Sequence, residues 1–202
     1  MRTYYVATAP AMPAVPTETK IFLPDYYKSE AAVQVTWIAP VNNGAPITGY
    51  KLYMSEGARE FHLIYDGTGR SDIISYTVTT NVMKTLNYNF KVSAINIIGE
   101  SQESLPLTSL IAVVPSSPLN LTFMSSNSGT IEVSWEAPRH DGGATLIGYY
   151  IYTKQTLAGI NAAFTKGTII SAQSLAIIVT GLTVDKEYAL YITAANVKGQ
   201  SI

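Results

Sequence analysis

The stretch WIAPVNNGAPITGYKLY, residues 37–53, returns in altered form as WEAPRHDGGATLIGYYIY, residues 135–152. In both copies a Trp is followed three positions later by Pro, then by a turn sequence of Asn or Asp with Gly, and then by Gly-Tyr. Trp135 follows Trp37 by 98 positions. A long pattern that occurs twice at such a spacing predicts two copies of one structural unit.

Two further landmarks repeat in the same order. Tyr149 follows Tyr50 by 99 positions, and YALYITAANVKGQS at 188–201 follows YNFKVSAINIIGES at 88–101 by 100 positions. The offset grows by one residue at a time, as expected when insertions accumulate in loops while the regular elements keep their length.

The local pattern inside the repeat has a period of two. In residues 33–37 and 131–135, Val, Ile and Trp alternate with Gln, Thr, Glu and Ser. Such alternation is typical of an antiparallel strand with one buried face, and no window of a dozen residues shows a helical stripe. Pro40 and Pro138 cannot donate to a strand ladder and mark where these strands end. Turn residues recur about every 8–12 positions, which predicts an all-β chain of two-sheet sandwiches with about seven strands each.

Each half resembles a fibronectin type III domain, a member of the immunoglobulin-like superfamily. The resemblance covers about 190 of the 202 residues. It is carried by the second-strand Trp, the third-strand Tyr, the spacing of a "tyrosine corner" (Val82 with Tyr88, Leu182 with Tyr188), and the ending A-x-N-x-x-G at 94–99 and 194–199. The loop sequences are similar to those of titin-type and twitchin-type domains and to those of cell-surface receptors.

The repeat and the resemblance together identify the expected core. The predicted structural core residues are Trp37, Tyr50, Val82, Tyr88, Phe90, Trp135, Tyr149, Leu182, Tyr188 and Leu190.

The domain boundaries follow from the same landmarks. We expect a first domain at 13–113, a linker at 114–118 with two prolines, and a second domain at 119–202. Fewer residues follow Gly199 than follow Gly99, so the second sandwich is expected to lack its final strand. Residues 1–12 are expected to form an N-terminal arm that reads as the last strand and linker of a preceding domain. Residues 3–9 could then either exchange as a strand between copies or form a disordered arm.

The composition and charge of the chain argue against two classes of partner. The chain carries 13% charged residues, a formal net charge of −1 and a pI of about 6.1, without a basic cluster. This balance gives no electrostatic basis for binding nucleic acid or a membrane surface. The chain has no Cys, which excludes disulfides, thiol catalysis and Cys-ligated zinc. The lack of Cys and of a signal sequence in this segment favours an intracellular location, while an extracellular one stays open.

No arrangement of residues predicts catalysis, a metal site or a cofactor. The two His residues, His62 and His140, fall in different halves, and no nucleophile with a base can be assembled. Tyr26 and Tyr27, in an insertion of the first half, are candidate interaction residues. The alternative is that they cover the open end of their domain or belong to an ordinary loop.

The expected function is therefore that of a non-catalytic spacer, scaffold or protein–protein interaction segment of a larger multidomain protein. Its partners would be other proteins or neighbouring domains of the same chain. Two alternatives stay open at this point: a fragment of an extracellular adhesion or receptor ectodomain, and an accessory module of an enzyme whose catalytic domain lies elsewhere.

Overall fold

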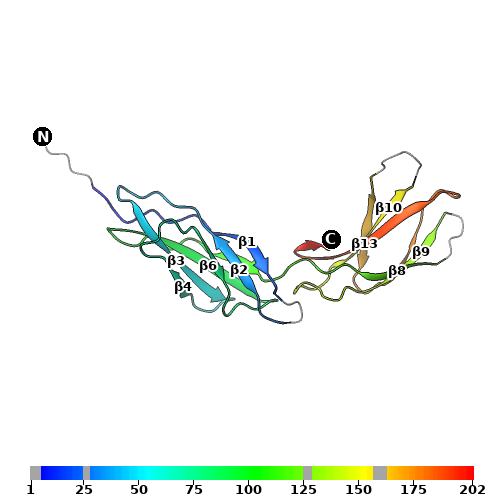
Figure 1. Cartoon of the computed structure of the whole chain (residues 1–202), viewed down its shortest axis with the longest axis horizontal. Helices are drawn as coiled ribbons and strands as arrows, with labels where there is room; N and C mark the ends of the chain where they lie inside the picture. The colour runs from blue at the N-terminus through cyan, green and yellow to red at the C-terminus, as the bar shows by residue number, and fades with distance from the viewer. Residues whose placement is uncertain (1–5, 25–27, 125–128, 157–162) are drawn as a thin grey trace. The chain divides into compact units, whose positions relative to one another are not determined.

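The computed structural model describes residues 6–24, 28–124, 129–156 and 163–202. The chain divides into two compact units, Met1–Ile111 (unit 1) and Ala112–Ile202 (unit 2). All regular secondary structure in the described ranges is β-strand (Figure 1), and every strand pair is antiparallel. The predicted all-β fold class is confirmed.

Unit 1 consists of two sheets. Its three-stranded sheet has the order β1 (Thr17–Phe22), β2 (Ala32–Thr36) and β5 (Ser75–Val78). Its four-stranded sheet has the order β4 (His62–Asp66), β3 (Ile47–Glu56), β6 (Asn87–Asn96) and β7 (Leu107–Leu110). One hydrophobic cluster draws side chains from both sheets, so the sheets form a sandwich.

Unit 2 repeats this arrangement. Its three-stranded sheet has the order β12 (Ala176–Val179), β9 (Ile131–Glu136) and β8 (Leu119–Met124). Its four-stranded sheet has the order β11 (Thr165–Ser171), β10 (Gly148–Gln155), β13 (Tyr188–Asn196) and β14 (Gly199–Gln200). Its buried side chains again come from both sheets.

The period-two pattern accounts for the packing. Val33, Val35 and Trp37 point inward from the three-stranded sheet of unit 1, while Tyr50 and Leu52 point inward from β3. The Trp37 and Tyr50 rings lie 5.7 Å apart at 59°. Tilted aromatic pairs of this kind add about 0.5–1.5 kcal/mol to the free energy gained from burial.

The same ring pair recurs in unit 2. The rings of Trp135 and Tyr149 lie 5.3 Å apart at 64°. Trp135 is 4% exposed and Tyr149 is fully buried. The repeated Trp and Tyr therefore join the two sheets of each sandwich at one equivalent position.

The seventh strands of the two units differ. In unit 1, β7 pairs with residues 87–90 at the start of β6. In unit 2, β14 has two residues and pairs with Ala195 and Asn196 at the end of β13. Strand β14 thus corresponds to the isolated bridge between Ile95 and Glu100 of unit 1 rather than to β7.

Candidate functional site

The residues predicted for the core of unit 1 come together in one cluster. Trp37, Tyr50, Val82, Tyr88 and Phe90 are all buried there, none more than 3% exposed. Strands β3 and β6 supply Tyr50, Tyr88 and Phe90, Trp37 directly follows β2, and Val82 comes from the connection before β6. They stabilise the sandwich and leave its outer surfaces to carry function.

The corresponding residues of unit 2 are less uniformly buried. Trp135 and Tyr149 belong to the buried cluster, and Leu190 packs against it while partly exposed. Leu182 and Tyr188 are also only partly buried. The candidate interaction residues Tyr26 and Tyr27 lie outside the described residues.

Both units contain the hydrogen bond that defines a tyrosine corner. The backbone N–H of Met83 donates to the Tyr88 hydroxyl at 3.1 Å, and that of Thr183 donates to the Tyr188 hydroxyl at 3.0 Å. Each bond ties the start of the sixth strand to the connection that leads into it. This local tie helps to fix the register in which the sixth strand enters its sheet.

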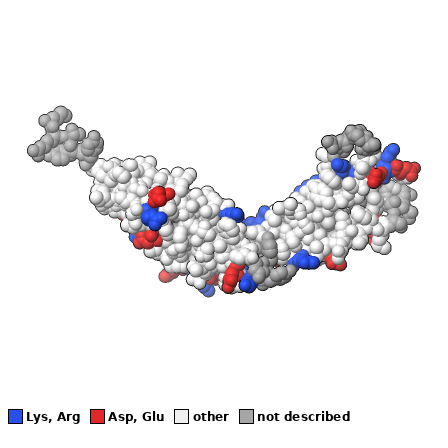
Figure 2. Space-filling view, viewed as in Figure 1, with Lys and Arg blue, Asp and Glu red and all other residues white. Residues whose placement is uncertain are grey.

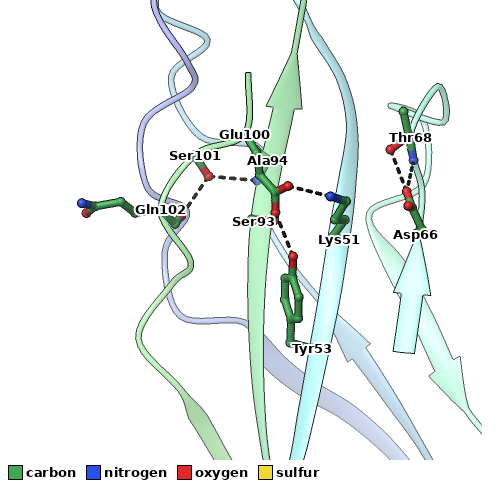
Figure 3. Close-up of polar contacts among 9 residues, drawn as sticks. All are labelled: Lys51, Tyr53, Asp66, Thr68, Ser93, Ala94, Glu100, Ser101 and Gln102. Carbon is green, nitrogen blue, oxygen red and sulfur yellow. Dashed lines mark hydrogen bonds and ion pairs between the residues drawn. The ribbon is translucent and has the colours of Figure 1, made fainter. Parts of the chain in front are cut away.

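A polar cluster occupies the outer face of the four-stranded sheet of unit 1 (Figure 3). The Glu100 carboxylate accepts hydrogen bonds from Lys51 Nζ at 2.6 Å, from the Tyr53 hydroxyl at 2.9 Å and from the Ser93 hydroxyl at 2.6 Å. Lys51 and Tyr53 lie on β3 and Ser93 on β6, so the cluster crosses two neighbouring strands. It holds the Lys51–Glu100 ion pair on this face of the sheet.

The cluster shifts the acidity of its members. Partial burial acts to raise the pKa of Glu100, but the hydrogen bonds from Lys51, Ser93 and Tyr53 outweigh it and the pKa lies below its ordinary value. The hydrogen bond to Glu100 raises the pKa of Lys51. Burial, followed by the bond to Glu100, raises the pKa of Tyr53. All three shifts favour a charged Lys–Glu pair beside a neutral phenol at neutral pH.

Unit 2 has a neutral version of this cluster. Gln200 accepts hydrogen bonds from the Tyr152 hydroxyl at 2.7 Å and from the Thr193 hydroxyl at 2.8 Å. These three residues occupy the places of Glu100, Tyr53 and Ser93, and the place of Lys51 is taken by Tyr150. The geometry is kept although both charges are gone.

Unit 1 also binds the segment that precedes its first strand. The Thr8 N–H donates to the Asn43 carbonyl at 3.2 Å. The Asn96 side-chain amide donates to the Thr8 carbonyl at 2.8 Å and to the Asn42 carbonyl at 3.2 Å. Asn96 is 4% exposed, so these bonds are shielded from water.

Unit 2 makes the same contacts with the segment before its own first strand. The Val113 N–H donates to the Gly142 carbonyl at 2.8 Å. The Asn196 side-chain amide donates to the carbonyls of Val113 at 2.8 Å and Asp141 at 2.7 Å. Asn196 is 3% exposed.

A second backbone bond completes each docking site. The Ala11 N–H donates to the Val41 carbonyl at 2.9 Å, and the Ser116 N–H donates to the His140 carbonyl at 3.1 Å. The sequence had marked Asn96 and Asn196 only as part of a strand ending. Their role in holding the preceding segment involves partners more than 80 residues away, which no local pattern specifies.

Residues suited to metal binding do not converge in the described ranges. No three His, Asp or Glu side chains there are grouped so that they could hold a metal ion. His62 lies in unit 1 and His140 in unit 2. The visible surface carries scattered charges separated by wide neutral areas (Figure 2). None of the described segments forms a helix of the length and hydropathy needed to cross a membrane.

Comparison with known proteins identifies the repeated unit. The family model "Fibronectin type III domain" matches residues 27–109 and 116–201. Human neogenin is 29% identical over 182 residues, which cover 86% of this chain and 12% of neogenin. The titin homolog of Caenorhabditis elegans is 29% identical over 178 residues, which cover 83% of this chain and 1% of that protein. The chain therefore spans a small part of the length of these relatives.

A solved structure supports the same fold. The FN1–FN3 domains of chicken CNTN1 match 97% of this chain and 66% of that chain, with a TM-score of 0.51 and 20% identity.

Proposed function

Since the chain belongs to the fibronectin type III family, we propose that it is a spacer or scaffold segment of a larger multidomain protein. Domains of this family are generally non-catalytic modules that typically mediate protein–protein interaction. The observation that carries the proposal is the repeated docking of the preceding segment onto each unit. A segment that is fastened to the next domain transmits position and force better than a free linker.

The backbone bonds around residue 112 support this proposal. Ile111 is bound to unit 1, because its N–H donates to the Leu86 carbonyl at 2.9 Å and its carbonyl accepts from the Thr85 N–H at 2.9 Å. Val113 is bound to unit 2, as described above. Ala112 alone separates these bonds. Although the sequence suggests a linker at 114–118, we propose that the flexible part of the junction is confined to the backbone near Ala112.

We interpret the segment before the first strand of unit 1 in the same way. Residues 8–11 bind unit 1 through the contacts that residues 113–116 make with unit 2. We propose that residues 1–12 are the arm through which unit 1 is joined to a preceding domain. Strand exchange between copies through residues 3–9 stays a prediction. It would have to break the bonds of Thr8 and Ala9 to Asn43 and Asn96.

Substitution of Asn196 tests the spacer function. Because the chain has no Cys, spin labels can be placed at Ser71→Cys in unit 1 and Thr168→Cys in unit 2, both exposed, without other reactive thiols. Pulsed electron resonance would then measure the distribution of distances between the labels. We expect the distribution to be broader in Asn196→Ala than in the otherwise unchanged chain, because the segment at Val113 loses its side-chain bond to unit 2. The Val113 amide of the variant should also exchange at least about tenfold faster.

Asn96→Ala is the matched control. It removes the equivalent side chain from unit 1, so it should free Thr8 and leave the distance distribution unchanged. An Asn196→Ala distribution no broader than that of the unchanged chain, or than that of Asn96→Ala, would overturn the proposal.

A further inference from the structure

The outer face of the four-stranded sheet of unit 2 carries a set of stacked aromatic rings. Tyr152 on β10 and Tyr191 on β13 are directly paired in the ladder, and their rings stack at 4.5 Å and 5°. The Phe164 ring meets Tyr191 edge-on at 4.7 Å. Tyr191 is 40% exposed and Phe164 39%, so the stack is open to solvent. We call Tyr150, Tyr152, Phe164 and Tyr191 the aromatic face.

Two lysines border these rings. Lys166 Nζ lies 3.7 Å from the centre of the Tyr150 ring, and Lys154 Nζ lies 5.2 Å from the centre of the Phe164 ring. Contact with a ring holds an ammonium group in place without neutralising it.

The lysines of the equivalent face in unit 1 are already neutralised by carboxylates. Lys51 pairs with Glu100 at 2.6 Å, and Lys91 pairs with Glu103 at 3.2 Å. In unit 2 the positions of Lys51 and Lys91 are held by Tyr150 and Tyr191, and that of Glu100 by Gln200.

The lysines on this face of unit 2 therefore lie at positions other than those of Lys51 and Lys91 in unit 1. Within the residues that the structure describes, neither Lys154 nor Lys166 has an ion pair with a carboxylate. The neighbouring segment 157–162 has the sequence LAGINA and contains no acidic residue that could supply one.

We propose that the aromatic face binds a carboxylate-rich segment of a partner protein. The partner's carboxylates would pair with Lys154 and Lys166, and its apolar side chains would pack on Tyr191 and Phe164. Exposed aromatic side chains are the type enriched at the centres of protein interfaces, and complementary charge sets the orientation of docking. A nucleic acid fits less well, because two cations neutralise too few phosphates to hold a polyanion at physiological salt.

This inference goes beyond the spacer role, and neither depends on the other. Docking of the preceding segment uses Asn196 and the loop before β10. The aromatic face uses the outer side chains of β10, β11 and β13. Loss of one property in a variant therefore leaves the other measurable.

Titration of the isotopically labelled full chain with two synthetic peptides tests the inference. The first is a dodecapeptide with four Glu and four Leu residues, and the second has Gln in place of each Glu. We expect the acidic peptide to shift amide signals of β10, β11 and β13 and to leave those of unit 1 unchanged. Lys154→Gln and Lys166→Gln should each weaken binding about fivefold, and Tyr191→Ala about tenfold or more.

Lys186→Gln is the matched control, since Lys186 is an exposed lysine of unit 2 outside these strands. It should bind the acidic peptide as the unchanged chain does, and the dispersion of its amide signals would show that it is folded. The inference is overturned if the Gln peptide binds equally well, if Lys186→Gln is as damaging as Lys166→Gln, or if no signal shifts at millimolar peptide. Tighter binding of a sulfated oligosaccharide or a DNA duplex at the same strands would also overturn the assignment to a protein partner.

Discussion

Units 1 and 2 share the order of their first six strands and differ on the outer face of the four-stranded sheet. Unit 1 holds a Lys51–Glu100 ion pair there, while unit 2 keeps the hydrogen bonds of the same site with Gln200 and surrounds them with aromatic rings. Outward-facing positions are free to differ in this way because the core is built from the alternate positions of each strand. The comparison shows that one fold presents two unlike surfaces in a single chain.

The interiors differ as well. At the corner, Val82 and Tyr88 of unit 1 are buried, whereas Leu182 and Tyr188 of unit 2 are only partly so. Strand β7 pairs with the start of β6 in unit 1, and no described strand occupies the matching position beside β13. Because less apolar surface is removed from water, we expect unit 2 to be the less stable unit.

Removing a tryptophan should produce the largest effect and test this ranking. Trp37→Ala and Trp135→Ala each delete a buried indole and leave a cavity, at a cost of about 3–5 kcal/mol in the free energy of unfolding. We expect Trp135→Ala to unfold unit 2 while unit 1 stays folded, and Trp37→Ala to lower the melting temperature of unit 1 only. Chemical denaturation followed by amide signals of each unit would check this. Unaltered melting of Trp135→Ala would contradict the assigned core.

A smaller effect, more nearly equal in the two units, is expected at Gly49, near the start of β3, and at Gly148, the first residue of β10. A Cβ at Gly49 would lie 2.1 Å from the Gly67 carbonyl oxygen, and one at Gly148 would lie 2.1 Å from the Ile170 carbonyl oxygen. Relief of either clash requires the neighbouring strand to move, so Gly49→Ala and Gly148→Ala should each cost about 1–3 kcal/mol.

Thermal melts of the two glycine variants would measure the cost in each unit. Gly57→Asn is the control, because nothing lies within 4 Å of its Cβ position and Asn tolerates its φ of 56°. Equal losses in Gly49→Ala and Gly148→Ala would show that the units share this close approach. A melting temperature that rises in either variant would show that the approach is looser than the structure indicates.

The smallest expected effect is on how the stability of unit 1 depends on pH. It distinguishes the outer face of unit 1 from that of unit 2. The pKa of Glu100 is lowered in the folded state, so the folded chain binds fewer protons than the unfolded chain as the pH falls below 4.5, the ordinary value. Its contribution to stability is present above that pH and is lost as the pH falls through the folded pKa. Because the pair is partly exposed, that contribution is at most about 1 kcal/mol.

Glu100→Gln gives unit 1 the residue that unit 2 already has. We expect the unchanged unit 1 to lose melting temperature on acidification more steeply than the variant does. The melting of unit 2 should be the same in both proteins, which provides an internal control. Identical acid profiles for unit 1 in the two proteins would remove Glu100 as the cause.

Prediction from sequence succeeded where the relevant partners are local or repeated. Alternation around Trp37 and Trp135 and the six-residue spacing that ends at Tyr88 and Tyr188 predicted strands and corners, because each is decided within one strand and its neighbouring turn. The chemistry of the outer faces was not predicted. Lys51 and Glu100 are 49 positions apart, and nothing local indicates that β3 and β6 bring them together.

The sequence by itself determined that this chain is a tandem of two β-sandwiches of the fibronectin type III family, since alternating apolar residues and turn chemistry act over a few positions. Only the tertiary structure decided which side chains share a surface and which segments are fastened. The Asn196 amide reaches Val113 and Asp141 because sheet pairing brings a turn, a loop and the incoming chain to one end of unit 2. Such bonds join residues far apart in sequence, so their geometry exists only once both sheets have formed.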